Sequence, residues 1–307
     1  MKLLVLSKDY AQYQALLQPQ LPEQVELVAT DRYDADPTVE IALAEPAMIA
    51  PLLAELPQLK WLQSTFAGVD ALMKEELRQD YLLTNIRGVF GPLMSEYVLG
   101  HIIALERRYA DYQKQQQHKV WQSHSYRSLQ GKRMLILGTG SIGQHLAGVA
   151  SAFGISVTGI SRSGQRVAGF QQTYPLDQLS RQLPDADYIV SALPDTPQTR
   201  HLFNENTFSC MKPNAVLINI GRGSAVDQEQ LVAALNKGRP GHAVLDVFQQ
   251  EPLPEEDPLW YHPKVTVTPH NAAYSFPEQV SEIFCANLKR WMADEAPQYQ
   301  VDFSKGY

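Results

Sequence analysis

The stretch Met134-Leu135-Ile136-Leu137-Gly138-Thr139-Gly140-Ser141-Ile142-Gly143 decides the fold of this 307-residue chain. Four apolar residues predict a buried strand, and three glycines with GxGxxG spacing lead from it into a helix-like segment, residues 144–152. The first glycine permits a tight turn, the second lets backbone N–H groups approach a pyrophosphate, and the third lets the helix pack closely on the strand. A glycine turn with only a structural role is the alternative, and the strand-turn-helix setting favours a dinucleotide site. Its expected cofactor contacts are Gly138, Gly140, Ser141, Ile142 and Gly143.

Apolar runs on both sides of this stretch indicate an α/β protein, and the chain length favours two domains. Downstream, six strand candidates alternate with helix-like segments and predict a doubly wound Rossmann sheet: residues 133–137, 156–160, 187–191, 215–219, 243–246 and 265–267. Upstream, shorter runs have the rhythm of βα units: residues 3–6, 41–44, 61–63 and 81–84. Between the blocks, apolar residues at helical spacing predict one long helix from Pro92 to the Gln-rich residues 113–117. A last helix is expected after Phe276-Pro277.

The composition excludes several classes of protein. Lys and Arg number 26 against 33 Asp and Glu, a net charge of −7, which is the wrong sign for a nucleic-acid-binding chain. The apolar run at residues 3–6 is too short for a signal-peptide core or a membrane span, so no membrane partner is expected. Cys210 and Cys285 lie far apart without CxxC spacing, which favours free thiols in a cytoplasmic protein that has no metal framework.

The residues after the second strand candidate bear on the choice of cofactor. Where an NAD-binding fold presents a carboxylate to the adenosine 2′-OH, the chain has Ser161-Arg162-Ser163-Gly164. No carboxylate is present there to repel a 2′-phosphate, Arg162 can pair with that phosphate, and Ser161 and Ser163 can donate hydrogen bonds to it. A solvated surface loop is the alternative interpretation. The sequence therefore predicts NADPH as the preferred cofactor, with NADH as the second choice.

Five ordered motifs indicate a family. They are the glycine turn with Gly131-Lys132 before it, LPDTPQT at 193–199, NIGRGSAVD at 219–227, LDVFQQEPLP at 245–254 and TPHNAA at 268–273. With them, nearly the whole chain resembles the D-isomer-specific 2-hydroxyacid dehydrogenases and, within these, the glyoxylate/hydroxypyruvate reductases. The resemblance implies a doubly wound Rossmann nucleotide-binding domain inserted into a smaller flavodoxin-like α/β substrate domain. The expected substrate domain is residues 1–98 and 276–307, and the NAD(P)-binding domain, with a dimerisation helix and arm, is residues 99–275.

The resemblance also implies a catalytic trio of Arg222, Glu251 and His270, each just past a strand candidate. Reduction of a 2-oxoacid needs a fixed cation, a proton for the developing alkoxide and a hydride delivered to C2. Arg222 can bind the substrate carboxylate and carbonyl with its planar fork, His270 can donate the proton, and Glu251 can orient the imidazole and favour its protonated form. Taken singly, Arg222 could be an ordinary residue of a Gly-Arg-Gly turn, Glu251 a solvated surface charge and His270 a structural histidine. Further cofactor contacts are expected at Leu193, Pro194, Ile220, Gly221 and Asp246.

Residues 63–70 resemble the family's substrate loop, in which backbone N–H groups near Ala67 and Gly68 receive the substrate carboxylate. Phe66 stands where relatives often have a smaller residue, so we expect it either to shape the substrate pocket or to belong to the core. The remaining expected substrate contacts are Arg222 and His270. Glu45 would disfavour an anionic substrate tail if it faced the cleft, and the sequence leaves its direction open.

The long helix and an arm through Trp121 to Leu129 correspond to the family's dimerisation region, which implies a homodimer. Trp121 and Tyr126 would be its anchor residues, and packing within one subunit is the alternative.

The expected function is NADPH-preferring reduction of small 2-oxoacids, such as glyoxylate or hydroxypyruvate, to D-2-hydroxyacids. One alternative is another dehydrogenase of the superfamily, acting on lactate, phosphoglycerate, formate or phosphite. The other is a corepressor or scaffold that senses NAD(P) without turnover, against which the presence of Arg222, Glu251 and His270 argues. The sequence leaves the choice of substrate open, because that choice depends on the shape of the pocket. One methylene contributes only about 1–3 kcal/mol of discrimination between substrates.

Overall fold

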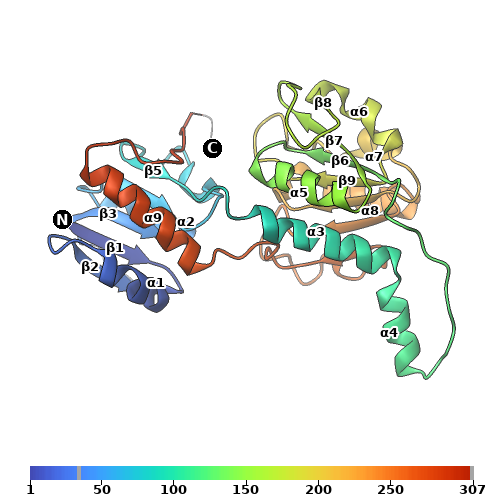
Figure 1. Ribbon diagram of the computed structural model, residues 1–307, viewed down its shortest axis with the longest axis horizontal. Helices are drawn as coiled ribbons and strands as arrows, with labels where there is room; N and C mark the ends of the chain where they lie inside the picture. Colours follow the sequence, from blue (N-terminus) through green and yellow to red (C-terminus); the bar gives the residue numbers. More distant parts are fainter. Residues whose placement is uncertain (33–35, 305–307) are drawn as a thin grey trace. The chain divides into compact units, whose positions relative to one another are not determined.

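The structure is a computed structural model that describes residues 1–32 and 36–304 (Figure 1). The chain divides into two compact units, the first made of Met1–Val89 and Ser275–Tyr307 and the second of Phe90–Tyr274. One unit is thus inserted into the other, and the first boundary falls at residue 89 instead of the expected residue 98. Residue 98 lies inside helix α3 (Gly91–Glu106), which belongs to the second unit because its apolar face packs in that unit's core.

The first unit contains a five-stranded parallel sheet in the flavodoxin-like order β2-β1-β3-β4-β5. Its strands are β1 (Lys2–Leu6), β2 (Glu26–Thr30), β3 (Val39–Ala44), β4 (Trp61–Ser64) and β5 (Leu82–Thr84). Its helices are α1 (Tyr10–Leu17), η1 (Gln18–Gln20), α2 (Pro46–Ile49), η2 (Ala50–Glu55), η3 (Asp70–Leu72) and α9 (Pro277–Met292).

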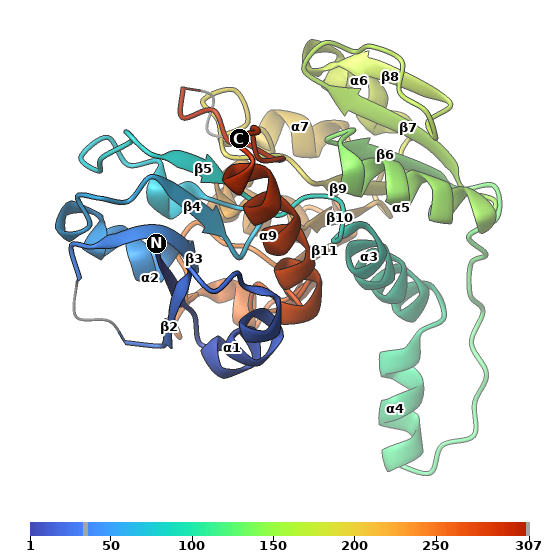
Figure 2. The same ribbon diagram turned by 60° about the vertical axis from the view of Figure 1, so that its left-hand side comes forward.

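Helices α1 and α9 lie side by side on one face of this sheet (Figure 2). The ring of Trp61 in β4 stacks here, with its centroid 5.2 Å from that of Phe284 and 5.6 Å from that of Trp291, both in α9. The start of α9 at Pro277 confirms the last predicted helix and follows from the preference of proline for the first turn. On the other face, apolar residues of α2 and η2 pack against β1 and β3.

The second unit contains a seven-stranded parallel sheet in the order β12-β11-β10-β9-β6-β7-β8. Its strands are β6 (Arg133–Leu137), β7 (Ser156–Ser161), β8 (Gln172–Pro175), β9 (Tyr188–Ser191), β10 (Val216–Asn219), β11 (His242–Leu245) and β12 (Val265–Val267). Besides α3, its helices are α4 (Tyr109–Gln117), α5 (Ser141–Ala152), η4 (Leu176–Gln178), α6 (Leu179–Gln182), η5 (Leu183–Asp185), α7 (Glu205–Cys210), η6 (Gly223–Ala225), α8 (Gln228–Asn236) and η7 (Pro258–Trp260).

Helices cover both faces of this sheet, which makes it doubly wound as expected (Figure 1). In β6, Leu135 and Leu137 point into the core shared with α6, α7 and α8, whereas Met134 and Ile136 point into the core shared with α3 and α5. Because both faces are buried, the central strands are continuous apolar runs, and this is why the sequence reveals them.

Two strands were absent from the sequence-based prediction. The strand β8 brings the expected six strands of the second unit to seven, and β2 completes the first sheet. Both lie at a sheet edge, where one side of the strand has no neighbour and polar residues are tolerated. The strand β8 is largely polar and ends at Pro175, so it has no apolar run to mark it. The strand β2 has only the short apolar run Leu27-Val28-Ala29 and is half-buried, and the sequence analysis passed over it.

The prediction of one long helix is wrong, because the chain forms two helices, α3 and α4, with a break at Arg108. Arg108 adopts a left-handed φ of 57°, which an α-helix cannot contain. Its Nε donates to Asp111 Oδ2 at 2.7 Å in the first turn of α4. Tyr109 and Tyr112, which extended the apolar spacing in the sequence, are exposed side chains of α4 and not part of a buried face.

Across residues 1–32 and 36–304, no helix combines the length and the apolar character needed to cross a membrane. Cys210 and Cys285 are free thiols, as predicted.

Candidate active site

The second unit collects its expected functional residues along one edge of the sheet. The strand β6 lies between β7 and β9, so the strand order reverses there, and sheets of this kind bind ligands beyond the carboxyl ends of the strands at such a point. The segments that leave the carboxyl ends of β6, β7, β9, β10, β11 and β12 carry the predicted residues at 138–143, 161–163, 193–194, 220–222, 246–251 and 270.

The glycine turn after β6 has the geometry that a dinucleotide pyrophosphate needs. Gly138 adopts a φ of 102°, and a Cβ atom there would lie 2.7 Å from the carbonyl oxygen of Ala192. A Cβ atom at Gly143 would lie 2.1 Å from Gly138 O, so α5 can begin close to β6 only with glycine at this position. At Gly140 a Cβ atom would meet nothing within 4 Å, which leaves the space before the N-terminus of α5 open. The turn therefore fits an anion bound by the first N–H groups of α5.

The loop after β7 has a fixed backbone and exposed side chains. Ser161 Oγ accepts a hydrogen bond from Gly164 N at 3.1 Å, and Thr173 Oγ1 of β8 donates to Gly164 O at 3.2 Å. Ser161 thus shapes the loop, and β8 holds it from the other side. Arg162 and Ser163 are exposed on this backbone.

The loops after β9 and β10 pack backbone to backbone. A Cβ atom at Gly221 would lie 2.6 Å from the carbonyl oxygen and 2.7 Å from the nitrogen of Leu193, so only glycine permits this approach. The side chains of Leu193 and Ile220 are buried in the cores on opposite faces of the sheet, whereas Pro194 is exposed. Backbone atoms and Pro194 are therefore the groups that these loops present to a ligand.

Arg222 follows the turn after β10 and has an extended backbone, with φ −138° and ψ 143°. The buried Asn219 fixes this turn, because its Nδ2 donates to Arg222 O at 2.8 Å and its Oδ1 accepts from Gly221 N at 3.2 Å. Arg222 Nη1 donates to Gly221 O at 2.7 Å. The charge of Arg222 lowers the pKa of both Glu251 and His270, so the structure brings the three predicted residues into one electrostatic site.

Glu251 and His270 are in direct contact, with 2.6 Å between Glu251 Oε2 and His270 Nδ1. Glu251 Oε1 accepts a hydrogen bond from Phe248 N at 2.9 Å, so both carboxylate oxygens are engaged. The side chains of Glu251 and His270 are 36% and 54% exposed. His270 Nε2 has no hydrogen-bond partner in the part of the chain that the structure describes, and it is the ring atom through which His270 can act on a substrate.

The contact shifts both pKa values in the direction that proton donation requires. The hydrogen bond with Glu251 raises the pKa of His270 and outweighs burial and the Arg222 charge, which lower it. Burial acts to raise the pKa of Glu251, but the hydrogen bonds with His270 and Phe248 N outweigh it, and the pKa of Glu251 is lowered. The pair therefore favours an ionised carboxylate beside a protonated imidazole.

Asp246, expected as a cofactor contact, is only 1% exposed and binds the loop that carries His270. Its Oδ1 accepts hydrogen bonds from Thr268 Oγ1 at 2.7 Å and Asn271 N at 2.9 Å, and its Oδ2 accepts from Ala272 N at 2.9 Å. His270 N donates to Asp246 O at 2.9 Å, and His270 adopts a φ of 53°, which residues other than glycine rarely adopt. Asp246 thus fixes the backbone of His270, and its contact with a cofactor stays a prediction.

Two further links were missed by the sequence analysis. The hydroxyl of Thr268 donates its one hydrogen to Asp246, so in its 2.6 Å contact with Tyr97 OH it is the acceptor. This hydrogen bond joins α3 to the loop after β12. Burial raises the pKa of Tyr97, which keeps this hydroxyl protonated. Asp195 Oδ1 accepts from Ser224 Oγ at 2.9 Å and ties the loop after β9 to the one after β10. Asp195 and Ser224 stand in quoted motifs, whereas only helical spacing marks Tyr97 in the sequence.

In the first unit, the loop after β4 presents two backbone N–H groups. Ser64 Oγ accepts from Phe66 N at 3.0 Å, and Asn85 Nδ2 donates to Ala67 O at 2.7 Å, so the loop is held at both ends. The N–H groups of Ala67 and Gly68 have no hydrogen-bond partner among residues 1–32 and 36–304. Phe66 is 41% exposed and does not belong to the core.

The direction of Glu45 is also defined within the first unit. Its Oε1 accepts hydrogen bonds from Ser7 Oγ at 2.8 Å and Lys8 N at 2.7 Å. The carboxylate of Glu45 is therefore bound to the segment that follows β1.

Residues 118–129 return from α4 towards β6 without forming a helix or strand, and together with α4 they project from the end of α3 (Figures 1 and 2). Arg127 pairs with the buried Glu106 through two hydrogen bonds of 2.6 and 2.8 Å, which anchors the end of this arm. Trp121 is fully exposed and Tyr126 is largely exposed. For Trp121 the alternative of packing within one subunit is therefore wrong.

Comparison with known proteins identifies the family. The model of the "D-isomer specific 2-hydroxyacid dehydrogenase, NAD binding domain" matches residues 99–272. The chain is 35% identical over 267 residues to the glyoxylate/hydroxypyruvate reductase A of Yersinia enterocolitica, a match that covers 83% of this chain and 84% of the relative.

Solved structures agree with this assignment. A D-isomer specific 2-hydroxyacid dehydrogenase family protein from Aeromonas salmonicida has a TM-score of 0.94 and 48% identity, with 98% of this chain and 99% of the other covered. An NADPH-dependent glyoxylate/hydroxypyruvate reductase from Sinorhizobium meliloti, in complex with NADP and sulfate, has a TM-score of 0.86 and 28% identity, with 100% and 99% covered. The chain belongs to the D-isomer specific 2-hydroxyacid dehydrogenase family and is an NAD(P)-dependent oxidoreductase.

Proposed function

We propose that this enzyme reduces small 2-oxoacids, such as glyoxylate and hydroxypyruvate, to D-2-hydroxyacids, with NADPH as the preferred cofactor. The observation that carries the proposal is the 2.6 Å contact between Glu251 and His270, together with the raised pKa of His270 and the nearby charge of Arg222. The names of the Yersinia and Sinorhizobium relatives support the substrate class.

Each residue of the trio has one task in the proposed reaction. The nicotinamide cofactor, when bound, supplies the hydride. His270 donates a proton from Nε2 to the developing alkoxide, while Glu251 holds the ring by Nδ1 and stabilises its positive charge. Arg222 binds the carboxylate and the carbonyl oxygen of the 2-oxoacid with its planar donor fork.

For the loop after β4, the N–H groups of Ala67 and Gly68 are proposed to bind a substrate carboxylate. Backbone N–H groups in a loop form a site for an anion, and these two have no partner in the described part of the chain. The exposed ring of Phe66 beside them is proposed to limit the size of the substituent at C3, which favours small substrates.

The preference for NADPH is proposed from the loop after β7. Arg162 is exposed there and no carboxylate stands between residues 161 and 164, so a 2′-phosphate meets a cation instead of a like charge. The NADPH-dependence in the name of the Sinorhizobium relative supports the same choice.

A homodimer formed through α4 and the arm is also proposed. Trp121 is fully exposed although tryptophan is a costly side chain to leave in water, and large aromatic side chains are typical anchors of interfaces. Cytoplasmic location likewise stays a prediction, drawn from the two free thiols.

A panel of 2-oxoacids, assayed with NADPH and NADH at equal concentration, tests the proposal. We expect the largest kcat/KM with glyoxylate or hydroxypyruvate and NADPH. A greater kcat/KM with pyruvate or phosphohydroxypyruvate would assign the enzyme to another branch of the superfamily. Binding of NADPH without turnover of any oxoacid would favour the corepressor alternative.

A further inference from the structure

The turn that carries Glu251 lies outside any helix or strand, although the position of its carboxylate decides the contact with the imidazole. Its first residue, Phe248, is buried, and a Cβ atom at Gly223 would lie only 1.9 Å from the Phe248 carbonyl carbon. The two residues in the middle, Gln249 and Gln250, are exposed. An exposed turn keeps a single conformation only if specific bonds offset its conformational entropy.

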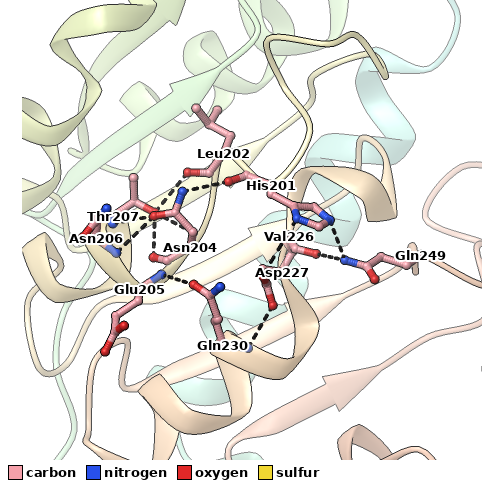
Figure 3. Close-up of polar contacts among 10 residues, drawn as sticks. All are labelled: His201, Leu202, Asn204, Glu205, Asn206, Thr207, Val226, Asp227, Gln230 and Gln249. Carbon is pink, nitrogen blue, oxygen red and sulfur yellow. Dashed lines mark hydrogen bonds and ion pairs between the residues drawn. The ribbon is translucent and has the colours of Figure 1, made fainter.

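Gln249 supplies such bonds from both its backbone and its side chain, and Figure 3 shows those of the side chain. Its N–H donates to Gln228 Oε1 of α8 at 2.7 Å. Its Nε2 donates to Val226 O at 2.7 Å and lies 3.2 Å from His201 Nε2. Since an amide nitrogen only donates, its two hydrogens serve Val226 and His201, and His201 Nε2 is the acceptor.

The surroundings of the His201 ring suit this arrangement. His201 Nδ1 lies 3.8 Å from Asp227 Oδ2, and a carboxylate on that side favours the tautomer with hydrogen on Nδ1 (Figure 3). That tautomer leaves the lone pair on Nε2, facing Gln249.

Both acceptors of the Gln249 amide belong to segments that are bound to the Arg222 turn. Val226 directly follows η6, which begins next to Arg222. The backbone N–H of His201 donates to Ser224 O at 2.8 Å. The side chain of Gln249 therefore joins the segment of one predicted catalytic residue to the turn of another.

We propose that Gln249 is a positioning residue, whose side-chain amide holds the turn of residues 248–251 in the conformation that brings Glu251 Oε2 to His270 Nδ1. The effect of Gln249 on catalysis rests on the proposed function, whereas its effect on the pKa of the His270 imidazole does not. A short contact of this kind weakens steeply when the two atoms move apart, so loosening the turn weakens the hold of Glu251 on the proton of His270.

The neighbouring Gln250 provides a matched control. It is the same residue type in the same turn, it is exposed, and it makes no hydrogen bond within the described residues. Gln249→Met removes the amide while keeping the length of the side chain, and Gln250→Met makes the same chemical change one position away. His201→Asn removes one acceptor of the Gln249 amide, and asparagine tolerates the positive φ of 49° at that position.

The experiment follows the imidazole of His270 by NMR over a pH titration of the full-length protein, with its signal identified by its loss in His270→Asn. The same variants are assayed for 2-oxoacid reduction with NADPH across pH. For Gln249→Met we expect a lower pKa of His270, a loss of activity that begins at lower pH, and a kcat lower by about threefold to tenfold, with KM for NADPH unchanged. We expect His201→Asn to change the same quantities in the same direction but by less, and Gln250→Met to match the unmutated protein.

Equal titration curves and pH profiles in Gln249→Met and Gln250→Met would overturn the proposal. An altered His270 titration in a variant series that turns over no 2-oxoacid would sustain the positioning of Glu251 and reject the proposed function instead. If Gln249→Met lost its cooperative thermal transition, the His270 titration and the pH profile of His201→Asn would test the proposal in its place. A His270 titration in His201→Asn equal to that of the unmutated protein would reject the proposal.

Discussion

The Glu251 turn and the loop after β7 leave the same edge of one sheet, yet the structure holds them differently. In the first, the functional side chain is fixed, since both carboxylate oxygens of Glu251 have partners. In the second, Ser161 and Thr173 fix the backbone while Arg162 is exposed. Proton transfer depends on the distance between two atoms, whereas an exposed cation acts on a phosphate over several ångströms. Substitutions in the first region should therefore change rates, and those in the second should change affinities.

The largest effect is expected from His270→Asn. Removing the proton donor should lower kcat for 2-oxoacid reduction about 10²–10⁴-fold, the usual range for loss of a general acid. Asparagine tolerates the φ of 53° at this position, so the backbone of the loop is preserved. NADPH affinity, measured by fluorescence titration, should be nearly unchanged. A variant with normal kcat would remove His270 from its role.

Arg222→Lys should come next. A lysine keeps the charge but loses the paired donors that fit a planar oxoacid, so kcat/KM should fall about 10–100-fold. The cofactor affinity should change little, because the residue is proposed to bind the substrate. An equal loss of NADPH affinity would mean that Arg222 binds the cofactor. The distinction between a region that sets rates and one that sets affinity would then fail.

Arg162→Ala probes the second region. We expect NADPH to bind about tenfold more weakly and NADH to bind as before, since an exposed pair with the 2′-phosphate is partly screened by water. Added salt should weaken NADPH binding more than NADH binding in the unmutated enzyme. Arg166 is exposed in the same loop, so Arg166→Ala is the matched variant. A loss of NADPH affinity confined to Arg166→Ala would move the phosphate contact to that residue.

Among the substitutions in the catalytic trio, Glu251→Gln is expected to lower the maximal rate least, because its amide oxygen can still accept from His270 Nδ1. The change should lie in the pH dependence. Glu251 raises the pKa of His270, and reduction needs the protonated ring, so activity is present at low pH and falls as pH rises through that pKa. Without the carboxylate, the fall should occur at lower pH. A pH profile identical to that of the unmutated enzyme would separate Glu251 from the titration of His270.

The sequence predicted the parts of the fold that the backbone or burial on both sides determines, and it missed parts at the edges of the sheets and at a helix break. The glycine turn after β6 was predicted residue by residue, because Gly138 and Gly143 are required by the backbone itself. The central strands were predicted because burial on both faces gives continuous apolar runs. The edge strand β8 and the helix break at Arg108 escaped prediction, since an edge strand needs no apolar run and the apolar spacing continues across the break.

Within the candidate site, the motifs indicated Arg222, Glu251 and His270 and the pairing of Glu251 with His270, but not the other bonds that hold these residues. Tyr97 and Gln249 make contacts with residues far away in the chain. Only helical spacing marks Tyr97 in the sequence, and Gln249 stands in its motif beside an identical residue, Gln250. The expected contact of Asp246 with the cofactor stays a prediction, and the bonds from its buried carboxylate to the loop of His270 were not predicted. Partners of this kind can be identified only from the structure, in which the segments that follow the strands lie at one edge of the sheet.

The split of the first unit has a consequence for synthesis on the ribosome. Trp61 packs against Phe284 and Trp291, so the sheet of residues 1–89 keeps an apolar face uncovered until α9 has been made. At about 5–20 residues per second, translation of residues 90–274 takes roughly 10–40 s. The nascent first unit must therefore wait through the synthesis of the entire second unit before its core can close. Ribosome-bound chains arrested at residue 274 should accordingly be cleaved by protease within residues 1–89, whereas the released full-length protein should resist cleavage there.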